Sequence, residues 1–179
     1  SDYLMLFYYT ILLLPLIYEV IKGIGLYWLD YQNKFLNLEY IMLAGFTIGI
    51  GFAFIQNLVY NIAFLNPLLI GEFTYMAIVL QRGIFNSLAE GCFSGFFAFV
   101  FFILKRNYSD DMNILTFSIA SFISFILHLM FNLSAILEKI EIHSSKIFLF
   151  SYNQTIIILL ILLVIIVLIK EKIKKIFNL

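Results

Sequence analysis

Five apolar segments, each about as long as a bilayer is thick, divide this sequence. A helix needs about 20 predominantly apolar residues to cross a hydrocarbon core of about 30 Å. The segments cover residues 3–28, 40–63, 74–104, 112–137 and 147–169. Only 12% of the residues are charged, which leaves too few polar side chains to cover a water-facing surface. The sequence therefore predicts an all-α integral membrane protein, a bundle of about five or more transmembrane helices.

We expect residues 1–179 to form a single transmembrane domain, because no polar linker or internal repeat divides them. Basic side chains gather on one side of the five-span arrangement, including those of the C-terminal tail. The positive-inside rule then predicts a multi-pass cell-membrane protein with its C-terminus cytoplasmic and its N-terminus outside. A chain that begins outside without a signal peptide suggests that further helices precede it. Equal numbers of acidic and basic residues, 11 each, give no indication of a nucleic-acid partner.

Four ionisable side chains lie inside the predicted spans. A charged group near the bilayer centre costs about 2.5–3.5 kcal/mol on insertion scales, so it normally faces the protein interior and marks a functional site. The four are Glu19, Arg82, Glu90 and His128. Lys22 follows Glu19 by one helical turn, where it can pair with that carboxylate or extend toward the headgroups.

Helical spacing places these groups on polar stripes of three predicted helices. The stripes are Gln56, Asn57, Tyr60 and Asn61; Arg82, Asn86, Glu90 and Ser94; and Ser121, Ser124, His128 and Asn132. Small residues run beside them and favour close helix packing, namely Gly45 and Gly49 on one helix and Ser87, Gly91 and Gly95 on another. We expect the three stripes to face one another, because that satisfies their polar groups inside the membrane.

Several kinds of chemistry suit such a cluster. A carboxylate and an imidazole can activate water for hydrolysis. Glu19, Glu90 and His128 could instead hold a divalent metal such as zinc, although no HExxH pattern is present. A proton or ion pathway uses similar residues, and a buried structural network needs no ligand at all. Composition and spacing leave these alternatives open.

Four short motifs resemble the PrsW family of intramembrane proteases. The segment from Tyr18 to Lys22 is similar to the family's EExxK motif, and the segment from Gly51 to Tyr60 is similar to its GFxxxEN motif followed by Tyr. Arg82 and the later run from Glu90 to Ser94 resemble its Arg and HxxxT segment, and the run from His128 to Asn132 resembles its HxxxN motif. Related families are the CAAX-prenyl endopeptidases and the bacteriocin-immunity membrane proteases.

The sequence departs from the family pattern at three positions. Tyr18, Gln56 and Glu90 stand where the pattern has Glu, Glu and His. Glutamine has the shape of glutamate but cannot take a proton as a base, so Gln56 cannot act as an ionised carboxylate. Either Glu90 supplies the missing carboxylate from the neighbouring helix, or the chain is inactive as written.

The resemblance implies an intramembrane endopeptidase, glutamic-type or metal-dependent, that cuts a membrane-anchored protein such as an anti-sigma factor within the lipid bilayer. It implies a catalytic set and an orienting set of side chains. The catalytic set is Glu19, Gln56, Glu90, His128 and Asn132, and the orienting set is Lys22, Asn57, Tyr60, Arg82 and Asn86.

Within the catalytic set, Glu19 or Glu90 would act as the general base, and His128 with Asn132 would polarise the scissile carbonyl. Lys22 and Arg82 would orient the carboxylates. The predicted spans place Glu19 toward the cytoplasmic half of the membrane and His128 toward the outer half, so a shared site requires helix tilt or a shifted first span. Non-catalytic relatives, small transporters and prenyl-protein endopeptidases remain alternatives.

Overall fold

The computed structural model describes residues 8–32, 37–107 and 113–141, and within these ranges nearly every residue is helical, with no strand. The elements in chain order are η1 (a π-helix, Tyr9–Leu13), α2 (Leu14–Tyr31), α3 (Leu38–Phe64), α4 (Pro67–Ile70), α5 (Glu72–Gln81), η2 (a π-helix, Arg82–Asn86), α6 (Ser87–Asn107) and α7 (Asn113–Glu141). The prediction of an all-α bundle is confirmed.

Four helical stretches are long and apolar enough to cross a membrane, namely Ile11–Tyr31, Leu38–Ala63, Glu72–Asn107 and Asn113–Leu133. They overlap the first four predicted spans, while the fifth, 147–169, lies outside the described residues. The first helix ends later than predicted, because Asp30 is buried within it and forms an ion pair with Lys105 of α6. The multi-pass membrane character follows from these four stretches.

Local sequence signals set the helix boundaries. The side chain of Asn37, in extended conformation, caps α3 by accepting a hydrogen bond of 2.8 Å from the backbone N–H of Tyr40. Pro15 lies in the first turn of α2, where a backbone N–H has no acceptor within the helix, so its missing N–H costs no hydrogen bond. Gly71 adopts a positive φ of 81° between α4 and α5, a conformation that favours glycine.

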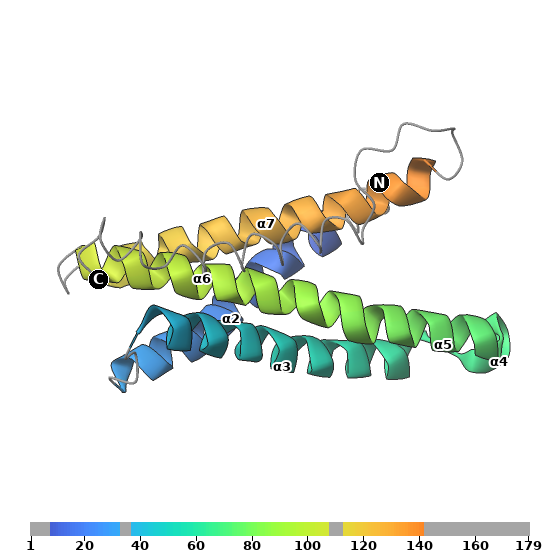
Figure 1. The fold of residues 1–179 in the computed structure, drawn as a ribbon. Coiled ribbons are helices and arrows are strands. Elements are labelled where there is room, and N and C mark those ends of the chain that lie inside the picture. Colours follow the sequence, from blue (N-terminus) through green and yellow to red (C-terminus); the bar gives the residue numbers. More distant parts are fainter. Residues whose placement is uncertain (1–7, 33–36, 108–112, 142–179) are drawn as a thin grey trace.

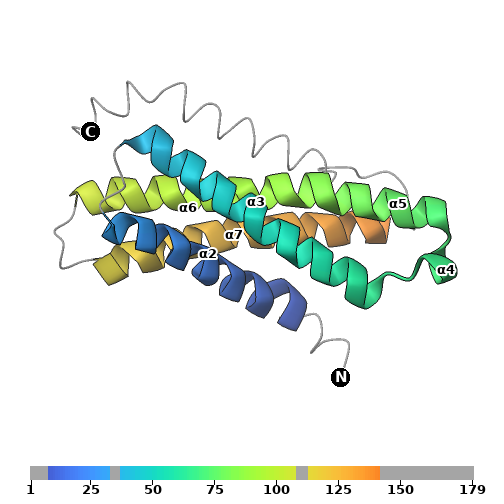
Figure 2. The ribbon, with the colours of Figure 1, turned by 90° about the horizontal axis from the view of Figure 1, so that it is seen from below.

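The helix α6 is the centre of the bundle. In Figure 1 it runs beside α7 on one side, with α3 along its other side, and Figure 2 shows α2 crossing near the same helices. The apolar window of the Glu72–Asn107 stretch is 67% buried, whereas the other spans bury between 33% and 39% of theirs. The aromatic side chains Phe93, Phe97 and Phe101 of α6 are fully buried and form much of the core.

Glycines bring α3 into backbone contact with α6. A Cβ atom added to Gly49 would lie 2.2 Å from the carbonyl oxygen of Glu90, and one added to Gly45 would lie 2.4 Å from that of Ser94. No side chain fits in either gap, so only glycine allows this approach. The predicted packing of small residues is present, and it places α3 directly against the turn of α6 that holds Glu90.

The predicted polar stripe from Arg82 to Ser94 assumed that the long third span is one regular α-helix. The structure shows that it is not. The five residues of η2 form a π-helical segment between α5 and α6. A π-helical turn holds more residues than an α-helical turn, so the faces before and after η2 are out of register. Arg82 consequently lies against α3, and its guanidinium stacks over the ring of Tyr60.

Candidate active site

Two carboxylates from different spans meet at one buried ammonium group. Lys22 Nζ lies 2.5 Å from Glu19 Oε1 on its own helix and 2.5 Å from Glu90 Oε2 on α6. The side chains of all three are at most 5% exposed. Buried carboxylates need an opposite charge close by, and Lys22 provides it to both. Between the two functions that the sequence left open for Lys22, the structure favours pairing with Glu19.

His128 of α7 joins the same cluster. Its Nδ1 lies 2.9 Å from Glu19 Oε1, and its Nε2 lies 3.5 Å from Glu90 Oε1. The ring stacks on Phe93 with centroids 4.8 Å apart, which fixes its plane. Each ring nitrogen therefore faces one of the two carboxylates.

The predicted difference in depth between Glu19 and His128 is wrong. The predicted first span, 3–28, put Glu19 past its middle, but His128 Nδ1 lies 2.9 Å from Glu19 Oε1, so the two side chains meet at one depth.

Ser124 is a member of the cluster that sequence analysis placed on the His128 stripe but not in the site. Its hydroxyl lies within hydrogen-bond distance of Glu19 Oε2 and 2.8 Å from the backbone oxygen of Phe93. It lies one turn before His128, so both side chains of α7 reach the same carboxylate. The sequence indicated the position of Ser124 only by its spacing from His128. That indication is weak, because serine is common in transmembrane helices.

A second polar group lies next to the cluster, between α3 and the η2 segment. The side-chain nitrogen of Asn57 donates to the backbone oxygen of Arg82 at 2.9 Å and to the hydroxyl of Ser87 at 3.4 Å. The Arg82 guanidinium carbon lies 3.6 Å from the centroid of the Tyr60 ring. In the described parts of the chain Arg82 forms no ion pair with a carboxylate, whereas Lys22 pairs with both Glu19 and Glu90.

The two positions that depart most from the family pattern are neighbours. The side chain of Gln56 lies beside the hydroxyl of Tyr18, and the Tyr18 and Phe52 rings are 5.1 Å apart. The charge of Glu90 is close enough to act on that hydroxyl. Gln56 and Tyr18 therefore border the carboxylate cluster.

The remaining predicted site residues lie at the edges. Asn86 of η2 and Asn132 of α7 are both half-buried. Asn132 follows His128 by one turn, and no hydrogen bond joins it to the described carboxylates or to Lys22. Thus the structure brings together Glu19, Lys22, Glu90 and His128 and places Gln56, Asn57, Tyr60 and Arg82 beside them.

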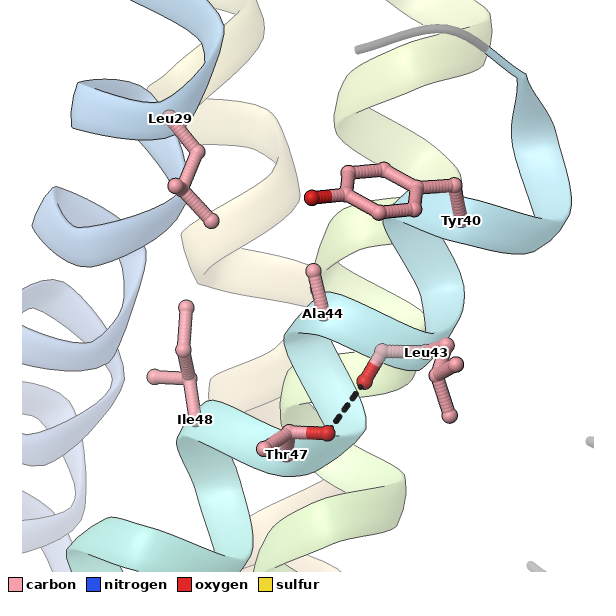
Figure 3. Close-up of a pocket in the computed structure, with 6 residues that line it drawn as sticks. All are labelled: Leu29, Tyr40, Leu43, Ala44, Thr47 and Ile48. Carbon is pink, nitrogen blue, oxygen red and sulfur yellow. Dashed lines mark hydrogen bonds between the residues drawn. The ribbon is translucent and has the colours of Figure 1, made fainter. Parts of the chain in front are cut away.

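A surface cavity of about 310 Å³ lies elsewhere, between the end of α2 and the first half of α3. Figure 3 shows that its walls are almost entirely apolar and that the Thr47 hydroxyl is bonded to the backbone oxygen of Leu43 at 2.8 Å. Its lining residues are Leu29, Tyr40, Leu43, Ala44, Thr47 and Ile48. No carboxylate or imidazole is among these lining residues.

Comparison with known proteins agrees with the buried cluster. A family model described as "PrsW family intramembrane metalloprotease" matches residues 2–169, nearly the whole chain. The chain belongs to the PrsW family. No curated protein and no solved structure matches it.

The PrsW family description implies a metal, and the donor set of this chain fits one. Glu19, Glu90 and His128 offer ligand atoms that all lie within 4.8 Å of one another. Two carboxylates and an imidazole with an open fourth position are a suitable donor set for a catalytic divalent ion. The Lys22 ammonium lies between the same two carboxylates, so a metal that used both of them would require Lys22 to move.

Proposed function

We propose that this protein is an intramembrane endopeptidase that hydrolyses a single-span, membrane-anchored protein substrate, for which an anti-sigma factor is a fitting example. The observation that supports this most is the convergence of Glu19, Glu90 and His128 around Lys22 in the interior of the bundle. Hydrolysis of a peptide bond needs a base for water and a group that stabilises the developing oxyanion, and these side chains provide both.

The contacts of the two carboxylates give them different functions. Both oxygens of Glu19 are engaged, Oε1 by Lys22 and His128 and Oε2 by Ser124. The Oε1 atom of Glu90 has a looser contact, with His128 Nε2 at 3.5 Å. Glu90 is therefore the better general base, and Glu19 is a positioning residue that holds Lys22 and His128.

Glu19 also determines which nitrogen of His128 is available. A carboxylate oxygen 2.9 Å from Nδ1 requires a proton on that nitrogen. In the neutral ring Nε2 is then free to take a proton, and in the charged ring it can donate one to an oxyanion. The imidazole edge that bears Nε2 lies beside Glu90, so base and acid act on the same side of the ring.

A divalent metal, where bound, would be held by Glu19, Glu90 and His128 and would supply Lewis-acid polarisation of the scissile carbonyl. The four-residue cluster has one uncompensated negative charge when His128 is neutral. Burial of such a charge is costly, so the cluster favours the binding of a cation.

The experiment uses the full chain in proteoliposomes with single-span reporter proteins. We expect cleavage by the unmodified chain and its loss, by at least about 100-fold, in Glu90→Gln and His128→Ala. Phe54→Leu is a matched control, because Phe54 faces outward and is 67% exposed. Equal cleavage by Glu90→Gln and the unmodified chain would reject this site.

A non-catalytic relative that binds membrane proteins is the second candidate. The contact between Gln56 and Tyr18 favours it, because both stand where the family pattern has glutamate. Gln56→Glu distinguishes the two candidates. If no reporter is cut either by the unmodified chain or by Gln56→Glu, the non-catalytic function is correct.

A further inference from the structure

Buried polar atoms without partners are concentrated at one place, next to the carboxylate cluster. Within residues 8–32, 37–107 and 113–141, six buried side-chain polar atoms have no hydrogen-bond partner. Four of them belong to one patch between α3 and η2. These four are Gln56 Oε1, Asn57 Oδ1, Asn61 Oδ1 and Arg82 Nε, which we call the amide patch. An unpaired buried polar atom costs about 1–3 kcal/mol, so four together need a ligand or another function.

The contacts of Asn57 fix the orientation of its free atom. Its nitrogen is used by the backbone oxygen of Arg82 and by Ser87, so the oxygen is the atom left over. Asn57 is 95% buried, its exposed fraction being 5%. Asn61 follows one turn later on the same face of α3, and its oxygen is also free. The amide patch thus presents acceptors in a row, with a donor from Arg82 facing them from the next helix.

The amide patch lies close to the reacting groups. Ser87, which Asn57 contacts, precedes Glu90 by three residues, a rise of about 4.5 Å along α6. Gln56 borders Tyr18, the neighbour of Glu19. The row from Gln56 to Asn61 extends about 7.5 Å along α3, which equals two to three residues of an extended chain. Its ligand would therefore lie within a few residues of a bond held at Glu90.

The chemistry of the amide patch matches an unwound polypeptide backbone. A transmembrane helix must open before a protease can cut it, and the freed N–H and C=O groups find no water in the hydrocarbon core. Three carbonyl-type acceptors suit the freed N–H groups, and Arg82 Nε suits a freed C=O. The side chains of Gln56 and Asn61 are partly exposed at the surface of the bundle, while their unpaired oxygens are buried.

We propose that Gln56, Asn57, Asn61 and Arg82 form a subsite that binds the extended backbone of a membrane-spanning substrate beside its scissile bond. This inference rests on the proposed protease function and names the substrate feature that is recognised, an unwound segment and not a particular side chain. The subsite replaces the hydrogen bonds that the substrate helix loses when it opens.

The binding test uses photo-crosslinking from the full chain in nanodiscs. A benzophenone amino acid replaces Leu65, the residue that caps the end of α3 four positions after Asn61, or Ile62, which is 77% exposed and serves as the control position. The probe is a synthetic single-span peptide of Leu and Ala with a central Gly-Pro pair, compared with the same peptide lacking that pair. We expect position 65 to crosslink the Gly-Pro peptide at least about 5-fold more than the uninterrupted helix, and position 62 not to distinguish them.

Substitutions then test the hydrogen bonds themselves. With the crosslinker at position 65, Asn61→Leu should weaken binding of the Gly-Pro peptide about 2- to 10-fold, the effect of one lost hydrogen bond, whereas Asn61→Gln should retain it. If reporter cleavage is measurable, Asn61→Leu should raise KM by a similar factor and leave kcat unchanged.

The outcomes separate this inference from the proposed function. Preferential crosslinking with no cleavage of any reporter would support the subsite and reject the protease function. Cleavage with equal crosslinking of both peptides would reject the subsite and leave the protease function in place. An Asn61→Leu variant that folds, binds and cleaves as the unmodified chain does would also overturn the subsite.

Discussion

The ammonium nitrogen of Lys22 lies 2.5 Å from the Oε2 atom of Glu90, although 68 positions separate the two residues in the sequence. This contact joins the first membrane span to the third. It also places a fixed positive charge among the atoms that would hold a metal, so Lys22 and a divalent ion require the same two carboxylates.

We therefore expect Lys22→Met to bind Zn²⁺ or Co²⁺ at least about 10-fold more tightly than the unmodified chain, because a competing charge next to the ligands is removed. Equilibrium dialysis with metal analysis measures this without reference to activity. Lys105→Met is the control, since Lys105 pairs with Asp30 and not with the cluster. Equal or weaker metal binding by Lys22→Met would show that Lys22 does not compete with the ion.

The close approach of α3 to α6 predicts a large difference between two glycines of one helix. Gly49→Ala should lower the free energy of unfolding by about 1–3 kcal/mol or more, because its Cβ would collide with the Glu90 carbonyl. Gly51→Ala meets no atom within 4 Å and should raise stability by up to about 1 kcal/mol. Unfolding titrations in mixed micelles measure both, and equal effects would contradict the packing described for α3.

Removal of the Ser124 hydroxyl should remove a hydrogen bond that holds the Glu19 carboxylate in position. We expect Ser124→Ala to lower the free energy of unfolding by about 1.5–3 kcal/mol, the range for a hydrogen bond to a charged group, and to reduce reporter cleavage. Ser118→Ala is the control on the same helix, because Ser118 is exposed and bonds only to the backbone oxygen of Ile114. A Ser124→Ala protein as stable and active as the Ser118→Ala protein would exclude this function of Ser124.

The stacking of Arg82 on Tyr60 predicts that lysine cannot replace it. Arg82→Lys keeps the charge but loses the planar group, so stability should fall by about 0.5–2 kcal/mol. At Arg106, whose guanidinium lies 5.7 Å from the Phe102 ring and faces outward, the same change should have little effect. Thermal unfolding of the two variants is the measurement, and indistinguishable midpoints would refute the stacking contribution.

The sequence predicted the parts of this structure that depend on local spacing and on apolar length. Four spans followed from runs of apolar residues. The pairing of Lys22 with Glu19, one turn away, was one of the two interactions predicted for Lys22. The face shared by Ser124 and His128 was also visible, since it needs only a regular helix.

Other features depended on contacts that no local pattern reports. The predicted depth of Glu19 was wrong because apolar content alone does not locate the ends of a span, and Leu29 and Tyr31 continue the first helix past its predicted end at residue 28. The π-helical turn at Arg82–Asn86 was missed because a single wider turn leaves the apolar content unchanged. The pairing of Lys22 with Glu90 is a tertiary contact between distant residues, and it required the packing of α2 on α6.

The continuous helical stretch from Glu72 to Asn107 contains 36 residues and is about 54 Å long, well beyond a hydrocarbon core of about 30 Å. Such a helix must tilt, or one end must lie among the headgroups. No residue of α5 is buried, whereas most residues of α6 are. The segment η2 joins these two helices beside the amide patch. Bilayer thickness would then act as an effector of this protein, because a thicker membrane would reorient α5 and transmit that change through η2 to Arg82.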